Sequence, residues 1–303
     1  MRVLILGAGG IGGYYGGRMT AAGVDVTFLV RARRAEVLAR DGLVVRSPVG
    51  DLEIAVKTVQ RETATPGYDA ILLSCKSYDL EDAIESIRPA AAGALIIPML
   101  NGIRHLDTLD AAFGADHVAG GVAMIGVDMD ADGTIRHLAR GHGLTYGERN
   151  AGQAPVCTAL APIFRDTGFD GRHSHEIMRD MWEKFVFITC NAGICCLMRG
   201  NVGEIARTQE GAGVMRDLIA ECATTAAAAG YAPREAFLER AGRQLTDPAS
   251  TTTASMLRDL RRGGQVEAEH VVGDMLARAR GAGLATPILR SIYTNLQVYQ
   301  AGL

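Results

Sequence analysis

Six residues near the start of the chain have the types and spacing of a pyrophosphate-binding turn. Gly7-Ala8-Gly9-Gly10-Ile11-Gly12 directly follows an apolar run, Val3 to Leu6, and begins a helical pattern. The first glycine of such a turn permits the tight bend, the second lets the backbone approach the phosphates, and the third allows close helix packing. The N–H groups at the start of the helix then receive the anion. We therefore predict a dinucleotide site at Gly7, Gly9, Gly10, Ile11 and Gly12, against the alternative of a glycine turn that binds nothing.

The residues after the second predicted strand indicate which dinucleotide binds. This strand, Val24 to Val30, is followed by Arg31-Ala32-Arg33-Arg34 at the point where an NAD enzyme carries an acid for the ribose hydroxyls. A cation there suits a 2′-phosphate instead. Asp25 does not replace the acid, because it lies at the other end of the strand. We expect NADP(H), bound through Arg31, while Arg33 and Arg34 fit the solvated start of a helix, a role also open to Arg31.

Polar residues also follow two later strands, and ligands of open α/β sheets bind beyond the carboxyl ends of the strands. These segments are Ser74-Cys75-Lys76 and Leu100-Asn101-Gly102. Lys76 is expected either to neutralise a cofactor phosphate or to reach the substrate. The Asn101 amide is expected to hold the ribose, the nicotinamide or the substrate. Both residues also fit ordinary turn chemistry.

Lys184 has an unusual position for a lysine. Ile177, Met181, Lys184, Ile188 and Asn191 recur with helical spacing, which places the lysine on an apolar stripe. The Asn191 amide lies on the same stripe and is expected to face the cleft and bind the substrate. Desolvation lowers the pKa of a lysine and makes its ammonium a better proton donor to the alkoxide that forms when hydride reaches a carbonyl. The alternative is that the methylene groups of Lys184 lie against the apolar surface while its ammonium group reaches solvent.

These residues must be positioned by two different kinds of structure. Short β-branched runs alternate with helical patterns in the first half, which predicts a parallel sheet covered by helices. Its strands are expected at Val3–Leu6, Val24–Val30, Ala70–Cys75, Leu95–Leu100 and Val118–Val127. Short antiparallel additions at the sheet edge are expected at Thr134–Leu138, at Leu144–Gly147 and near Phe169.

Only helical periodicity follows residue 174. Helices are expected at Ile177–Met198, Gly213–Ala229, Pro233–Arg243, Val266–Arg280 and Pro287–Tyr299. The predicted fold class is an α/β Rossmann-type dinucleotide-binding domain, residues 1–172, followed by an all-α substrate and catalytic domain, residues 173–303.

Composition excludes several classes of protein. The chain has 303 residues, of which 48% are apolar and 21% charged, with a net charge of −3, so neither disorder nor a nucleic-acid or acidic-membrane partner is indicated. The apolar stretch Phe185–Met198 is too short to span a membrane. Six cysteines without a CxxC spacing favour reduced thiols in a cytoplasmic protein. His173 and His175 lie two residues apart without the spacing of cysteine or acidic ligands that a metal site would have, so no metal site is predicted.

The segments GAGGIGGYYGGRM, SCKSYD, LNG, WEKF, SML and EAEHVVGDM resemble the ketopantoate (2-dehydropantoate) reductase family, in order and spacing, over nearly the whole chain. The resemblance implies NADPH as cofactor, catalysis in a cleft between the two domains, and a place in pantothenate biosynthesis. It also implies that Lys184 donates the proton and that Glu267, twelve residues after Ser255, binds the substrate hydroxyl. Ser255 is expected either to bind a substrate carboxylate or to end a helix.

The sequence departs from the family pattern after the lysine. The family carries asparagines four and eight residues after it, where this chain has Ile188 and Ala192, and Asn191 is one place short. We therefore predict a more apolar site and a preference for a 2-oxo acid with an apolar tail over ketopantoate. Glu267 and Glu269 also fit plain acids at a helix start, favourable to its dipole, and a single histidine such as His270 is more often structural.

The predicted function is NADPH-dependent reduction of a small 2-oxo acid, and a homodimer is the expected oligomeric state. Two alternatives stay open. One is an NADP(H)-binding sensor or scaffold without turnover, and the other is a related hydroxyacid dehydrogenase with a different substrate.

Overall fold

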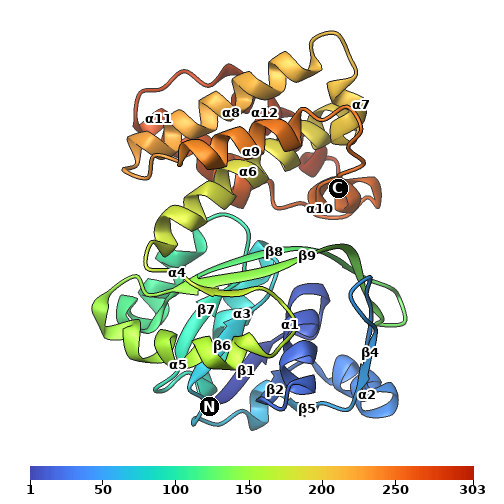
Figure 1. Cartoon of the computed structure of the whole chain (residues 1–303), viewed down its shortest axis with the longest axis vertical. Coiled ribbons are helices and arrows are strands. Elements are labelled where there is room, and N and C mark those ends of the chain that lie inside the picture. Colours follow the sequence, from blue (N-terminus) through green and yellow to red (C-terminus); the bar gives the residue numbers. More distant parts are fainter. The chain divides into compact units, whose positions relative to one another are not determined.

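The computed structural model describes residues 1–303, which form two compact units. The first unit comprises residues 1–100 and 105–177, and the second comprises 101–104 and 178–303. Strands occur only in the first unit, while the second consists of helices and loops (Figure 1). This confirms the predicted fold class, a Rossmann-type α/β part followed by an all-helical part. The predicted domain limits, 1–172 and 173–303, stay a prediction from sequence.

A five-stranded parallel sheet forms one layer of the first unit, in the order β5-β2-β1-β6-β7. Its strands are β1 (Arg2–Leu6), β2 (Asp25–Leu29), β5 (Lys57–Val59), β6 (Ala70–Leu73) and β7 (Leu95–Pro98). The central strands are apolar along their length because helices cover the sheet. Leu6 pairs in register with Leu29 and Leu73, and Leu73 pairs with Pro98. The segments that follow these strands therefore begin at one edge of the sheet.

Four helices of the first unit each follow a strand of this sheet: α1 (Gly10–Ala21), α2 (Ala32–Asp41), α3 (Leu80–Ile87) and α4 (His105–Phe113). The fifth helix of the unit, α5 (Ala154–Arg165), comes later in the chain.

The predicted antiparallel additions to this sheet were wrong, because those segments build a second sheet. Its order is β10-β9-β3-β4, and β8 pairs with β9. The strands are β3 (Leu43–Arg46), β4 (Leu52–Ile54), β8 (Gly120–Met129), β9 (Ile135–Gly147) and β10 (Gly171–His173). β8 was expected in the parallel sheet but runs antiparallel to β9, and β10 runs parallel to β9. The two predicted pieces at 134–138 and 144–147 are parts of the single strand β9.

The glycine content of α1 explains why two sheets form. A Cβ on Gly16 would lie 2.4 Å from atoms of Ile5 and Phe28 in the parallel sheet. A Cβ on Gly17 would lie 2.7 Å from Leu43 in the second sheet. The helix is therefore packed between both sheets, and a side chain at either of these two positions would collide with one of them. Its apolar neighbours from both layers form one core.

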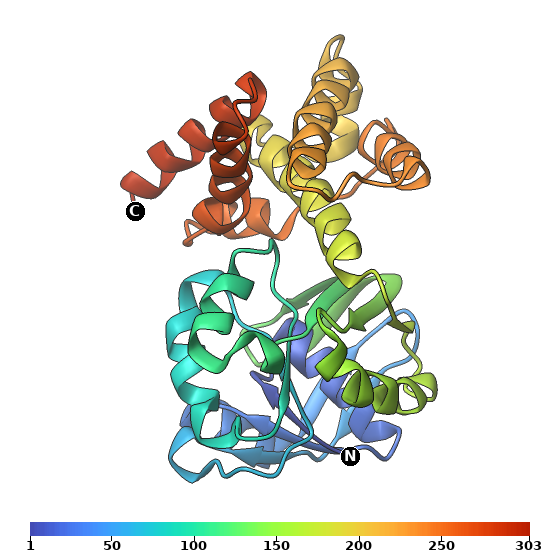
Figure 2. The same cartoon turned by 90° about the vertical axis from the view of Figure 1, so that its left-hand side faces the viewer.

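The second unit is built around one long helix, α6 (Ile177–Met198), whose bounds match the predicted ones. The other helices are α7 (Val202–Ala206), α8 (Gly211–Ala228), α9 (Glu235–Leu245), α10 (Ser255–Arg261), α11 (Asp274–Gly281) and α12 (Pro287–Ala301), with a π-helical turn, η6 (Glu269–Gly273), before α11. Figure 2 shows this bundle from the side. α7 and α10, both short, were not predicted.

By length and composition alone, the whole of α6 could cross a membrane. The prediction from sequence considered only its apolar segment Phe185–Met198, which is too short to do so. However, 78% of its most apolar window is buried inside the structure. A helix that is buried on most of its faces is typical of a protein core.

Candidate active site

The glycine turn after β1 has the backbone geometry that the sequence predicts. Gly7 has φ of +85°, and its N–H donates to the Leu29 carbonyl at 2.9 Å. A Cβ there would lie 2.9 Å from the Ser74 carbonyl oxygen, so both conformation and space require glycine. A Cβ on Gly12 would lie 2.2 Å from the Ser74 hydroxyl, which itself donates to the Leu6 carbonyl at 2.8 Å. Ser74, directly after β6, therefore packs against the glycine turn and supports it.

The start of α1 is suited to an anion. Gly9 is the N-cap residue, no side chain caps this end of the helix, and no acid lies in the first turn. A Cβ on Gly9 would meet nothing within 4 Å, so the turn is open at this point. Gly10 and Ile11 form the first helical turn beside it. Backbone N–H groups at an uncapped, acid-free helix start bind phosphate groups. The residues present therefore fit the pyrophosphate of a dinucleotide.

Two arginines near this turn have different environments. Arg31 is the N-cap residue of α2, its side chain is 78% exposed, and it pairs with Asp82 at 2.7 Å. Arg34, by contrast, is half-buried and donates to the Ala8 carbonyl from Nε at 3.1 Å and from Nη2 at 2.9 Å. The Arg34 guanidinium also reaches the Gly133 carbonyl at 3.1 Å. Arg34 thus holds the glycine turn, which is more than the solvated helix start expected for it.

Lys76 and Asn101 lie beyond the ends of β6 and β7. Lys76 is partly exposed and precedes a short 3₁₀ turn, Ser77–Asp79. Asn101 belongs with the second unit, where the backbone of Asn101 hydrogen-bonds the His270 side chain. Gly102 has φ of +76°, and a Cβ there would lie 2.9 Å from the His270 carbonyl oxygen. His270, which the sequence left unassigned, therefore holds this loop.

Lys184 lies on α6, and its environment differs from the predicted apolar stripe. Residues on nearly every face of α6 are buried, while Lys184, Phe187 and Ile188 share the one partly exposed face at this level. Burial lowers the pKa of Lys184 to about 8, although the negative charge of Glu267 acts in the opposite direction. An ammonium with a pKa near neutral pH is suited to general acid catalysis.

Glu267 is the carboxylate that acts on this lysine. Its side chain is buried, with 7% of the residue exposed, and it lies just before the π-helical turn η6. Such π-helical turns are frequent at functional sites. Glu269, the other predicted candidate, is exposed and accepts a hydrogen bond from the Tyr293 hydroxyl at 2.7 Å. The structure therefore separates two acids that the sequence distinguished only by their spacing from Ser255.

The other predicted substrate residues have different settings. Asn191 is buried, and its Oδ1 accepts a hydrogen bond from the Cys195 thiol at 3.6 Å. Ser255 is partly exposed and begins α10, so the alternative that it ends a helix was wrong. Ala192, where the family pattern has an asparagine, is buried.

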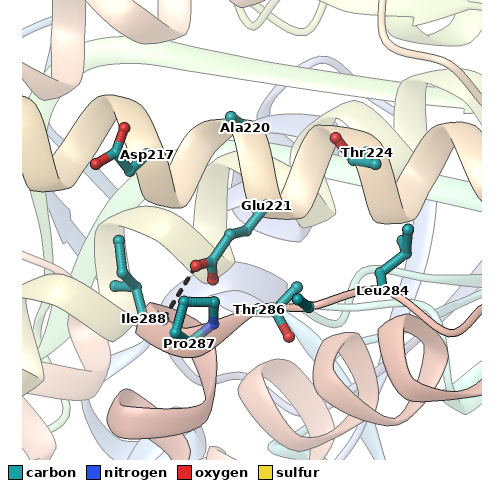
Figure 3. A pocket seen from close by; sticks show the side chains of 9 residues that line it. Asp217, Ala220, Glu221, Thr224, Leu284, Thr286, Pro287 and Ile288 are labelled. Carbon is teal, nitrogen blue, oxygen red and sulfur yellow. Dashed lines mark hydrogen bonds between the residues drawn. The ribbon is translucent and has the colours of Figure 1, made fainter.

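A cavity of about 380 Å³ lies between α8 and residues 284–288 (Figure 3). The Glu221 carboxylate crosses it and accepts hydrogen bonds from the N–H groups of Ile288 at 3.0 Å and Leu289 at 2.9 Å. This contact caps the start of α12. None of the predicted site residues lines the cavity, so its most direct role is structural.

Comparison with known proteins agrees with these features. Residues 3–151 match the family described as ketopantoate reductase PanE/ApbA, and residues 176–300 match its C-terminal part. The chain is 36% identical to an uncharacterized oxidoreductase, YkpB, of Bacillus subtilis, over 99% of both chains. It is 28% identical to a 2-dehydropantoate 2-reductase of Halobacterium salinarum, again over 99% of each.

A solved structure extends the likeness to three dimensions. The 2-dehydropantoate 2-reductase of Geobacter metallireducens superimposes with a TM-score of 0.89 at 29% identity, over 99% of this chain and all of the other. The two family matches, over residues 3–151 and 176–300, cover parts of both units. The chain therefore belongs to the ketopantoate reductase family and is an NADP-dependent oxidoreductase that acts on a CH–OH/C=O pair.

Proposed function

We propose that this enzyme reduces the carbonyl group of a small 2-oxo acid and that Lys184 donates the proton. The observation that carries the proposal is the pair of Lys184, with its pKa near 8, and the buried carboxylate of Glu267. When bound, the reduced nicotinamide supplies the hydride to the carbonyl carbon. The glycine turn holds the pyrophosphate, and Arg31 holds the 2′-phosphate.

The chemistry of Lys184 follows from its protonation state. Negative charge develops on the carbonyl oxygen as the C–H bond forms, and the Lys184 ammonium transfers one proton to that oxygen. The neutral amine then regains a proton from solvent. With a pKa of about 8, Lys184 is mostly protonated at neutral pH, yet it gives up its proton more readily than an ordinary lysine. Glu267 keeps the lysine charged before the reaction and binds a substrate hydroxyl where one is present.

We further propose that the substrate has a more apolar tail than ketopantoate. Phe187 and Ile188 accompany Lys184 on the partly exposed face of α6. Asn191, the nearest amide on this helix, is buried and already accepts a bond from Cys195. A substrate hydroxyl left unpaired against apolar side chains costs roughly 1 to 3 kcal/mol. In this proposal the enzyme is cytoplasmic, and pantothenate biosynthesis is its pathway only if ketopantoate proves to be its main substrate.

The test is NADPH oxidation by the purified enzyme with pairs of 2-oxo acids that differ only in the terminal hydroxyl. We expect kcat/KM to be higher for the member without the hydroxyl. If ketopantoate leads by more than about tenfold, or roughly 1.4 kcal/mol in transition-state binding, the substrate proposal is wrong. If the protein binds NADPH but turns over none of the acids, the alternative of a sensor or scaffold is favoured. Lys184→Ala serves as the control for enzyme-dependent oxidation.

A further inference from the structure

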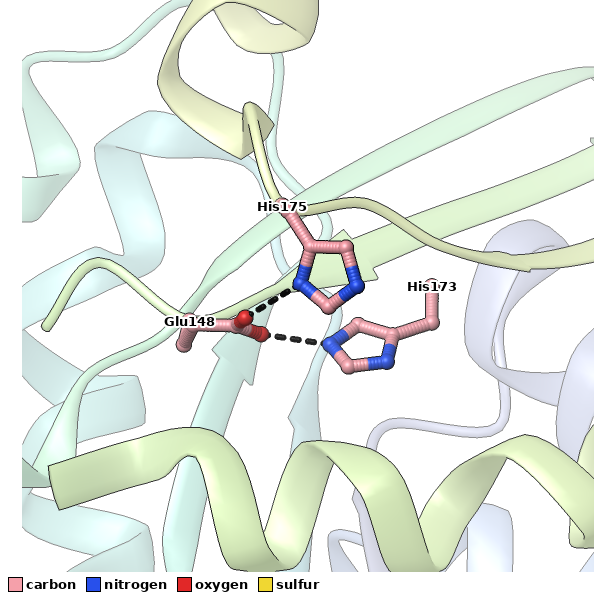
Figure 4. Close-up of side chains that lie close together, drawn as sticks. All are labelled: Glu148, His173 and His175. Carbon is pink, nitrogen blue, oxygen red and sulfur yellow. Dashed lines mark hydrogen bonds and ion pairs between the residues drawn. The ribbon is translucent and has the colours of Figure 1, made fainter. Parts of the chain in front are cut away.

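The structure brings together one carboxylate and two imidazoles that the proposed reaction does not use. Glu148 follows the last residue of β9, His173 ends β10, and His175 lies two residues further along. The Nε2 atom of His173 lies 2.5 Å from one carboxylate oxygen of Glu148, and Nδ1 of His175 lies 2.7 Å from the other (Figure 4). One ligand atom from each residue falls within 4.8 Å of the others. The sequence did not indicate Glu148 as a ligand, because it lies 25 residues before His173 in the chain.

Two of these side chains are held in place by the fold. β10 pairs with β9 so that His173 is opposite Tyr146, and the two rings stack with centroids 5.4 Å apart and planes 8° from parallel. The Ser174 N–H donates to the Tyr146 carbonyl at 2.8 Å, which fixes the chain as it leaves β10. The side chains of His173 and Glu148 are 14% and 17% exposed, whereas that of His175 is 79% exposed. The cluster therefore combines two fixed ligand groups with one that is open to solvent.

We propose that Glu148, His173 and His175 bind a divalent transition-metal ion of the borderline class, such as Zn²⁺. Imidazole nitrogens and carboxylate oxygens are ordinary ligands of this class, and three protein ligands leave one position for water. The metal binds the ring nitrogen of each imidazole that faces Glu148. A neutral imidazole therefore carries its proton on the other ring nitrogen in the metal-bound form, whereas an imidazolium releases one proton to solvent on binding.

The charge of Glu148 supports the site. Burial alone would raise the pKa of this carboxyl, but hydrogen bonds from His173 and His175 outweigh burial and lower the pKa to about 2. Both carboxylate oxygens of Glu148 face an imidazole nitrogen, so a cation between these groups would meet all three residues. A metal bound here would also tie the end of β9 to the segment 173–175, which leads into α6.

Cobalt provides a direct test, because the visible absorption of Co²⁺ reports its ligands. The full-length enzyme, purified without a histidine tag and treated with a chelator, is titrated with Co²⁺ and then with Zn²⁺ as competitor. We expect one equivalent of Co²⁺ to bind and to be displaced by Zn²⁺. His175→Gln should weaken Co²⁺ binding by at least about 10- to 100-fold. This is the loss seen when a residue that only hydrogen-bonds a metal ligand is removed, and His175 is proposed to be a ligand itself. Because His175 is exposed, this variant keeps the fold.

His117→Gln is the matched control, since His117 is an exposed histidine outside the cluster. It should bind Co²⁺ as the wild type does. Zn²⁺ should raise the thermal midpoint of the wild type and of His117→Gln but not of His175→Gln. The proposal is overturned if the wild type gives only the spectrum of the hydrated ion. It is also overturned if His175→Gln binds Co²⁺ as tightly as the control.

Discussion

Replacing Glu267 with glutamine should move the pH limit of the reduction reaction. As the proton donor, Lys184 must be protonated, so kcat/KM should fall about tenfold per pH unit above its pKa, which lies near 8. Burial lowers this pKa, and the charge of Glu267 partly restores it. Glu267→Gln removes that charge, and an opposite charge at close range is commonly worth about one pKa unit or more. The falling limb should therefore begin about one pH unit lower, near pH 7.

The assay is kcat/KM for NADPH-dependent reduction across the pH range, with a 2-oxo acid that lacks the hydroxyl. Because Glu267 is also proposed to bind the hydroxyl, the position of the limb, and not the height of the profile, is the readout. Glu269→Gln is the matched control, since it removes the same charge two residues away, where the acid pairs with Tyr293. An unchanged limb in Glu267→Gln, or an equal shift in Glu269→Gln, would refute the proposed coupling.

Four further predictions concern the proton donor, the cofactor-binding arginine and the glycine turn. Lys184→Ala should lower kcat by on the order of 10² to 10⁴ while NADPH affinity, measured by fluorescence titration, stays nearly intact; a wild-type rate would remove Lys184 from the mechanism. Arg31→Asp should lower the preference for NADPH over NADH by roughly 1 to 3 kcal/mol in kcat/KM, and an unchanged ratio would contradict its role. Gly12→Ala should lower the free energy of unfolding in urea by about 1 to 3 kcal/mol, because its methyl group meets Ser74. Gly9→Ala should leave stability unchanged and weaken NADPH binding, since the methyl group enters open space at the turn.

Much of the fold could be predicted from local patterns. The strand before the glycine turn and the long helix α6 have patterns that extend over their whole length, and the structure confirms both. The second sheet could not be predicted in the same way. It depends on the packing of α1 between two layers, and Gly16 and Gly17, which have no side chains, do not reveal in sequence what lies on either side of the helix. Strands such as β4, which has only 3 residues, are too short for their apolar alternation to stand out from the rest of the sequence.

The candidate site likewise has features that local sequence patterns predict and features that they do not. The backbone geometry of Gly7 and the low pKa of Lys184 follow from a motif and a helical spacing that sequence reasoning can detect. The contacts of Arg34 with the Ala8 carbonyl and of His270 with the Asn101 backbone have no local signal. They join residues that are far apart along the chain, and only the folded backbone brings them together.

The charged residues of helix α6 differ in how fully their charges are paired, and this difference argues that Lys184 has a function. Asp180 and Glu183 are buried, and both accept hydrogen bonds from Arg234, at 2.8 Å for the Nε–Oε1 contact with Glu183. Buried charges with such partners are ordinary structural ion pairs. Lys184, the next residue, has the charge of Glu267 nearby, but this charge does not offset burial, and the lysine pKa stays near 8. Burying Lys184 without full compensation of its charge costs stability, although the acids of the same helix are well paired. Ionisable groups with pKa values perturbed in this way cluster at functional sites. Because the proton donor of a carbonyl reduction needs a pKa near the working pH, the incomplete pairing of Lys184 is the condition that the chemistry requires.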